Sequence, residues 1–369
     1  NLVSNGLFKF DNGTVSLEQV SGTQELQLAA TGNYFNTLKI NCSGTTVTLN
    51  NSLTMKDDLI IQAGTFNPQN NTLYVGGDWS NTFGTAGFTE GTGRVVFNGG
   101  NYHQYSSAET FSILEVNKSA GGALRMNGTN VTCSKYDWTA GAIDVLNNGT
   151  FTVSSQLLDN GIAGNFYLNT GCTINLTNLT GNIDLKGNLY IYGGNFNVIG
   201  GINPSWWPYG GNASITMSGG VLDFADQSIS IKTDATYSFT HNITGGTIRT
   251  AKNFSNSRSD FTPTAGTIEM YGSTESSLLV TAGNLFTLRL NKTAGTTVNA
   301  DASATINGGL SILGGTLRVN NKILSIGDVI TINSGGTLWM DLNSQLKIAP
   351  SKTLTDRKST RLNSSHVSQ

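Results

Sequence analysis

Short stretches in which apolar and polar residues alternate run through most of the chain. Residues 46–49 (TVTL) and 150–153 (TFTV) place every second side chain on an apolar face. This period of two indicates strands with one buried face, and no longer stretch shows a convincing helical period. Gly-Gly, Asn-Gly and Asn-Asn pairs between the stretches predict tight turns, because these residues accept positive φ. The pattern therefore predicts an all-β protein.

A glycine precedes many of these strands and marks a repeat. The phrase Gly315-Thr316-Leu317-Arg318-Val319 returns in related form at residues 246–249, 266–270 and 336–340. Marked glycines of this kind lie 20 to 29 residues apart, at Gly22, Gly44, Gly64, Gly93, Gly122, Gly149, Gly171, Gly194, Gly220, Gly246, Gly266, Gly295, Gly315 and Gly336. A propeller blade would need roughly 40 to 50 residues. We therefore predict a right-handed parallel β-helix, or β-solenoid, with coils of about 20–29 residues, in which Gly141 fits the phrase but not the spacing.

A longer duplication is built from these coils. Residues 114–121 (LEVNKSAG) match residues 288–295 (LRLNKTAG). The upstream residues 88–99 and 261–272 match in the same way. We therefore expect two equivalent blocks of about 30 residues or more, each made of several coils.

Composition limits the classes of partner and the boundaries of the fold. The 369 residues carry a net charge of -2, which disfavours nucleic acid, and no apolar run is long enough to span a membrane. Three scattered cysteines, Cys42, Cys133 and Cys172, indicate small buried residues and not a disulfide framework or a zinc site.

We predict a single β-helix array over residues 1–355. Residues 356–369 lose the glycines and the alternation and turn basic, and residues 356–366 resemble a translated sequencing adapter. We therefore expect this tail to be non-native and the chain to be a fragment truncated at both ends.

Acidic residues are the first candidates for catalysis, because β-helix enzymes that cleave polysaccharides cluster carboxylates, or a carboxylate and a basic residue, on one sheet. Asp57 and Asp58 are adjacent, so in a strand they would point to opposite faces. We expect them in a solvated turn, and the same for Asp223 and Asp226 at a strand end. The sequence predicts no catalytic residue.

Metal sites and cofactors are not indicated either. His103 and His241 have no acidic neighbour in sequence and no metal-ligand spacing, so we expect surface residues. The Gly-Gly-x-Gly-x-Asp repeat of calcium-binding β-rolls is missing from the sequence. We expect no metal and no cofactor.

One aromatic segment is not explained by the repeat. Trp206, Trp207, Pro208 and Tyr209 follow Pro204 and are flanked by glycines, which predicts a loop outside the coils. Aromatic faces on a loop can stack on sugar rings or anchor a protein partner. The alternative is that the rings fold back on the flank of the solenoid. Trp206, Trp207 and Tyr209 are the candidate ligand-binding residues.

The repeats resemble those of a known class of proteins. Residues 73–82, 88–99 and 114–119 are similar to repeats of large secreted surface proteins of the Bacteroidota, which are commonly cargo of the type IX secretion system. The similarity is best over residues 34–130 and 255–345, and autotransporter passenger domains are a more distant comparison. The resemblance implies an extracellular, adhesin-like or structural protein at the bacterial surface and supplies no catalytic residue.

The predicted function is adhesion or structural presentation without catalysis. Surface glycans or other cell-surface proteins are the expected partners. The alternatives are a polysaccharide lyase or glycoside hydrolase, a glycan-binding module that uses the aromatic loop, and a passive spacer. An enzyme should bring acidic or basic side chains together in a cleft on one sheet. A stalk or adhesin should instead present a sheet of Thr, Ser and Asn.

Overall fold

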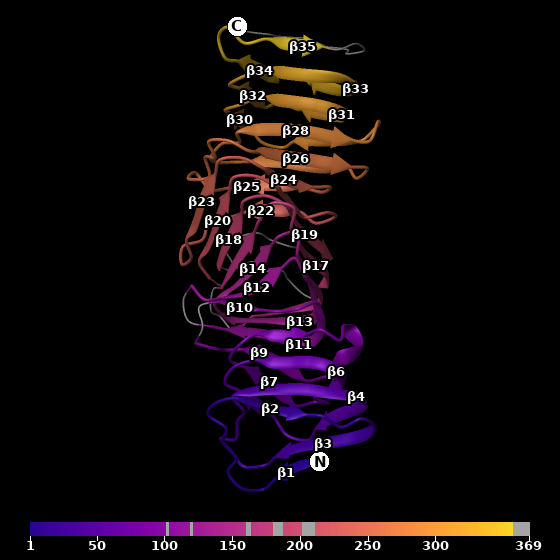
Figure 1. Ribbon diagram of the computed structural model, residues 1–369. Helices are drawn as coiled ribbons and strands as arrows, with labels where there is room; N and C mark the ends of the chain where they lie inside the picture. Colours follow the sequence, from indigo (N-terminus) through magenta and orange to yellow (C-terminus); the bar gives the residue numbers. More distant parts are fainter. Residues whose placement is uncertain (101–102, 119–120, 160–163, 180–186, 201–210, 357–369) are drawn as a thin grey trace. The chain divides into compact units, whose positions relative to one another are not determined.

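The chain folds as a β-solenoid. The computed structural model describes residues 1–100, 103–118, 121–159, 164–179, 187–200 and 211–356 (Figure 1). Parallel strands stack in about 15 turns, which confirms the predicted all-β parallel β-helix. The described residues contain one helical element, the short 3-10 turn η1 (Thr85–Gly87). They form two compact units, Asn1–Leu179 and Thr180–Gln369.

Unit 1 contains three parallel sheets. The first joins β1 (Leu2–Ser4), β3 (Gly22–Leu28), β4 (Thr37–Leu49), β6 (Leu59–Asn67) and β8 (Trp79–Asn81), with β2 (Thr14–Leu17) beside β4. The second joins β5 (Leu53–Met55), β7 (Thr72–Val75), β9 (Arg94–Phe97), β11 (Glu109–Asn117), β13 (Asn130–Ala140), β15 (Thr150–Asp159) and β17 (Thr173–Leu179). The third joins β10 (His103–Tyr105), β12 (Ala123–Asn127), β14 (Ala142–Leu146) and β16 (Asn165–Leu168).

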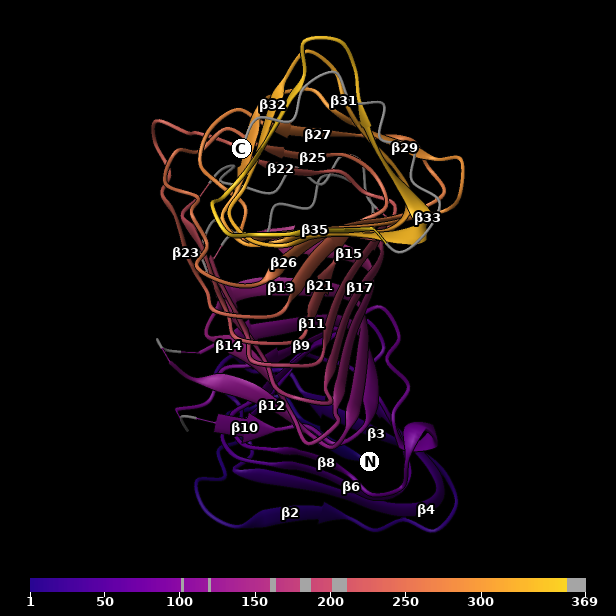
Figure 2. The same ribbon diagram turned by 90° about the horizontal axis from the view of Figure 1, so that it is seen from above.

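Unit 2 repeats this architecture, and its C-terminal coils overlie one another in Figure 2. The longest series is β19 (Asn195–Gly200), β21 (Val221–Asp223), β24 (Thr247–Thr250), β26 (Thr267–Gly272), β28 (Thr287–Lys292), β31 (Leu310–Val319), β33 (Ile330–Met340) and β35 (Leu354–Asp356). A second series is β22 (Ile229–Ile231), β25 (Phe254–Asn256), β27 (Ser276–Val280) and β29 (Thr297–Ala300), which also pairs with β31. Shorter sheets are β18 (Gly187–Ile191), β20 (Ala213–Met217) and β23 (Phe239–Ile243), then β30 (Ala304–Ile306), β32 (Ile323–Ile326) and β34 (Gln345–Ile348).

Apolar columns hold the coils together. Ile248, Ile268 and Leu288 are paired in register on β24, β26 and β28, and each is at most 4% exposed. Leu310 and Ile330 continue the same column. Because neighbouring strands lie about 4.8 Å apart, each inward side chain packs on its counterpart in the next coil. The alternation in the sequence therefore produces one continuous core in each unit.

The coil length differs from the predicted range at its upper end. Paired residues in successive coils lie between 19 residues apart (Arg94 with Ile113) and 26 residues apart (Asn195 with Val221). The predicted 29-residue intervals join glycines on different sheets. Gly93 precedes β9, whereas Gly122 precedes β12, which pairs with β10 and β14. Gly141 is not out of register, because β12 and β14 pair Ala123 with Ala142.

The duplicated blocks are confirmed in three dimensions. β9 pairs with β11 as β26 pairs with β28, and the matched lysines Lys118 and Lys292 are only 2% and 3% exposed. The Lys292 ammonium donates hydrogen bonds of 2.8 Å to two backbone carbonyls of lower coils. A Cβ on Gly315 would lie 2.4 Å from the Cβ of Lys292, and one on Gly141 would lie 2.9 Å from that of Lys118. Each buried lysine is therefore packed under a glycine of the next coil.

The remaining predictions concern single residues and the tail. Cys42, Cys133 and Cys172 are free and buried, as expected. No helix of the described residues is long and apolar enough to cross a membrane. Asp356 ends β35, and the rest of the predicted foreign tail, residues 357–369, lies outside the described residues.

Candidate functional site

The aromatic loop predicted to bind ligands is not among the described residues. Trp206, Trp207 and Tyr209 fall in residues 201–210, outside the part of the chain that the structure describes. Their role stays a prediction. The candidate site is therefore sought on the described strands and turns.

Asp57 and Asp58 lie in the turn between β5 and β6, as predicted. The Asp58 carboxylate accepts the backbone N–H of Asp78 at 2.7 Å, and the Asp78 carboxylate accepts that of Tyr105 at 2.8 Å. Burial, and then the charges of Asp58 and Asp78, raise the pKa of Asp57. These acids are near one another, but the hydrogen bonds of Asp58 and Asp78 tie them to the backbone of stacked turns, which is a structural use.

The prediction for Asp223 is wrong in one respect. Asp223 ends β21 as expected, but it is 8% exposed and forms an ion pair of 2.7 Å with Arg249 on the next coil. Its other oxygen accepts a hydrogen bond of 2.9 Å from the Tyr271 hydroxyl. Asp226 is exposed, as predicted. Sequence spacing could not show the correction, because Arg249 and Tyr271 belong to other coils.

Asp223 and Arg249 start a row of alternating charges on the outer face of this sheet. The strands β21, β24, β26 and β28 place Asp223, Arg249, Glu269 and Arg289 in one register row. Arg289 approaches Glu269 to 3.5 Å, and the amide of Asn291 donates to the same carboxylate at 3.1 Å. We call these four charged residues the charge row. Its carboxylates are occupied by partners within the row and beside it, so the row serves to hold the register of the coils.

The two histidines contact backbone and neighbouring charge. Nε2 of His241 lies 3.1 Å from the amide nitrogen of Thr262 and 2.9 Å from the carbonyl oxygen of Asp260. Burial and the nearby charge of Arg125 lower the pKa of His103. Among the described residues, no three His, Cys, Asp or Glu side chains are arranged to hold a metal ion.

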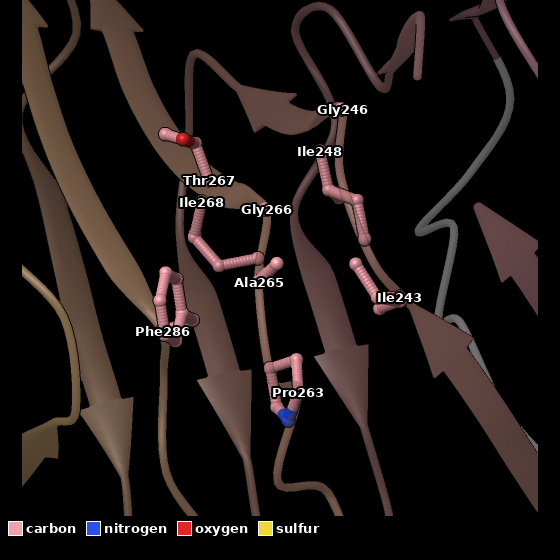
Figure 3. Close-up of a pocket in the computed structure, with 9 residues that line it drawn as sticks. All are labelled: Ile243, Gly246, Ile248, Pro263, Ala265, Gly266, Thr267, Ile268 and Phe286. Atoms are coloured by element: carbon pink, nitrogen blue, oxygen red, sulfur yellow. The ribbon is translucent and has the colours of Figure 1, made fainter. Parts of the chain in front are cut away.

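An apolar cavity in unit 2 is too small for an organic ligand. Ile243, Ile248, Ile268 and Phe286 are among the side chains that line it (Figure 3). Its volume is about 10 Å³, which is at the lower limit for one water molecule. It is a packing defect between coils.

The strongest candidate for a binding site lies on the outer face of β29, β31 and β33. Asn299, Arg318 and Trp339 occupy one register row on these strands. Trp339 is 47% exposed. Its indole N–H donates a hydrogen bond of 2.7 Å to Asp341, which also accepts one of 2.7 Å from Nε of Arg318. We call Trp339, Asp341 and Arg318 the Trp339 platform, in which the exposed indole is fixed in orientation.

A polar hollow of about 490 Å³ adjoins this platform. Its polar lining residues are Asn299, Asp301, Arg318, Asn320, Asn321 and Lys322. The side chains of Asn299, Asn320, Asn321 and Lys322 make no hydrogen bond or ion pair to any described residue. The hydrogen bond from Arg318 lowers the pKa of Asp341, which therefore stays ionised. Arg318 belongs to both features, so the ring and the unused polar groups form one surface.

This surface can bind, and the sequence held one sign of it. In the repeated phrase, the outward position is Arg249, Glu269 or Arg318 in other coils but Trp339 in one. A large aromatic residue at an outward strand position departs from the alternation. The hollow itself could not be predicted, because its walls come from residues about 20 positions apart.

Comparisons with models of protein families, with curated proteins and with solved structures find no match to this chain. What the chain binds therefore has to be inferred from its own residues.

Proposed function

We propose that this chain is part of a secreted cell-surface β-solenoid that binds saccharides through the Trp339 platform and the polar hollow, in an adhesive or structural role. The observation that carries the proposal is the exposed indole of Trp339, fixed by Asp341 beside a hollow with unused polar side chains. No catalytic step is part of the proposal.

The chemistry of sugars fits this surface. One face of a pyranose ring presents C–H groups, which pack on an aromatic ring, while its edge presents hydroxyl groups. The amides of Asn299, Asn320 and Asn321 each offer both donors and an acceptor to such hydroxyls. Because Asp341 holds the Trp339 indole already, little side-chain entropy is lost when a ligand binds.

Export and location rest on the resemblance of the repeats. Residues 34–130 and 255–345 resemble repeats of type IX secretion cargo of the Bacteroidota, which supports an extracellular, surface-attached protein. The test is the full-length gene product. Loss of the protein from intact cells on treatment with external protease supports surface exposure, and full protection of the protein from protease would contradict it.

Trp339→Ala tests the proposed function. Wild type and variant are compared for binding to an array of bacterial and host polysaccharides, with Tyr74→Ala, an exposed aromatic residue on β7, as the control. Loss of one stacked ring should weaken binding by about 10-fold or more while thermal stability is unchanged. Unchanged binding by Trp339→Ala, or no binding of wild type to any saccharide, would sink the proposal.

A catalytic alternative is favoured only by the charge row. Asp223, Glu269 and two arginines on one sheet are the residue types that polysaccharide-cleaving β-helices use. Prolonged incubation with a panel of polysaccharides, followed by assay of reducing ends and unsaturated products, tests it. We expect no product, and product that Glu269→Gln abolishes would establish the enzyme instead.

A further inference from the structure

The residues of the candidate site come from three successive coils. Asn299 and Asp301 belong to the coil of β29, Asn320 and Lys322 follow β31, and Trp339 lies on β33. The register row Asn299, Arg318, Trp339 runs across the strands, along the direction in which the coils stack. With strands about 4.8 Å apart, the site extends about 10 Å in this direction. That length exceeds a single sugar ring.

The charges of the site balance within it. Arg318 is paired with Asp341 at 2.7 Å. Lys322 and Asp301 both line the polar hollow and carry opposite charges. Asp301 also accepts a hydrogen bond from the Ser277 hydroxyl. The hollow and the platform together therefore have no net formal charge, and their spare groups are mainly the amides of three asparagines.

A balanced, amide-rich site discriminates against charged sugars. A carboxylate or sulfate that reached Lys322 would also lie in the hollow that Asp301 lines, and repulsion would offset the attraction. Hydroxyl groups carry no such penalty, since amide and carboxylate groups can donate to them or accept from them.

We infer that the Trp339 platform and the polar hollow bind an uncharged polysaccharide, with at least two sugar rings laid across the coils from Trp339 towards Asn299. This inference rests on the proposed function and gives it a substrate class. One ring stacks on the Trp339 indole, and the following ring places its hydroxyl groups against the asparagine amides of the hollow.

Calorimetry with the whole chain tests the inference. The probes are a neutral β-linked glucan, its mono- to tetrasaccharides, and a polyuronate of the same linkage. Affinity should rise by about 10-fold or more from the monosaccharide to the trisaccharide, and the neutral polymer should bind at least about 10-fold more tightly than the polyuronate. Between about 50 and about 500 mM NaCl, neutral binding should change by less than about twofold.

Two variants separate this inference from the proposed function. Asn299→Ala should weaken the trisaccharide and leave the monosaccharide unchanged, and Asp301→Asn should raise the affinity for the polyuronate. If wild type prefers the polyuronate and salt weakens that binding, the inference fails while Trp339→Ala can still abolish binding. If Trp339→Ala binds every probe as wild type does, the proposed function fails together with the inference.

Discussion

At the scale of single residues, the most unusual group in unit 1 is the buried carboxyl of Glu109, at the start of β11. It is 3% exposed, beside the indole of Trp79 and its aromatic neighbours. The Asn81 amide donates to it at 2.7 Å and the Trp79 indole N–H at 3.2 Å. Burial outweighs these hydrogen bonds and raises the pKa of Glu109 to about 7, from an ordinary value near 4.5.

This raised pKa predicts a pH-dependent stability. Between about pH 4.5 and about pH 7 the folded chain keeps the proton of Glu109 that the unfolded chain has released. The contribution is therefore complete below about pH 4.5 and is lost as pH rises through about 7. We expect the free energy of unfolding of wild type to fall by on the order of 2 kcal/mol across this window.

Glu109→Gln, which does not titrate, should flatten that slope. Chemical unfolding at a series of pH values from about 4.5 to about 8 measures it. Glu18→Gln, at an exposed site, is the control and should keep the wild-type slope. A Glu109→Gln variant with the wild-type pH dependence would show that another group is responsible.

At the scale of elements, the glycine phrase predicted the strands correctly but not their register. Gly266 precedes β26, which pairs with β28, whereas Gly315 lies inside β31, whose C-terminal half pairs with β29. Three strands of one coil share the same alternation, so a glycine before one cannot be told from a glycine before another. The duplication around Lys118 and Lys292 avoided this ambiguity, because a longer match fixes the strand as well as the period.

The pairing of Gly315 with Lys292 gives a prediction about glycine itself. Gly315 and Gly295 both have positive φ, 73° and 84°. A Cβ on Gly295 would meet nothing within 4 Å, whereas one on Gly315 would lie 2.4 Å from the Lys292 Cβ. Gly295→Ala should cost about 1–2 kcal/mol from the backbone alone. Gly315→Ala should cost clearly more, and equal losses on chemical unfolding would mean that the close approach has no energetic effect.

The charge row predicts a coupled pair of substitutions. Arg249→Met leaves the buried Asp223 carboxylate without its cation, which should cost about 1–3 kcal/mol, moderated by the partial exposure of Arg249. Asp223→Asn combined with Arg249→Met should recover much of that loss. Lys352→Met, which breaks the exposed pair with Asp328, is the control and should change stability by less than about 1 kcal/mol. Additive effects at Asp223 and Arg249 would argue against coupling between them.

At the scale of the whole molecule, alternation and period were enough to predict a β-solenoid, because every coil repeats the same inward pattern. They were not enough to predict the site. Asn299, Arg318 and Trp339 are neighbours only through register, and the repeat makes such residues look equivalent to those of other coils. The Trp206 loop stays a separate prediction, since residues 201–210 lie outside the described ranges. Function in this chain therefore follows from departures from the repeat.

Saccharide binding across the coils is the central claim. The most direct measurement is a crystal structure of the chain with a bound neutral oligosaccharide. We predict one ring stacked on the Trp339 indole and a second ring whose hydroxyl groups reach the asparagine amides of the polar hollow. A saccharide bound elsewhere, with the Trp339 ring uncovered, would contradict the account.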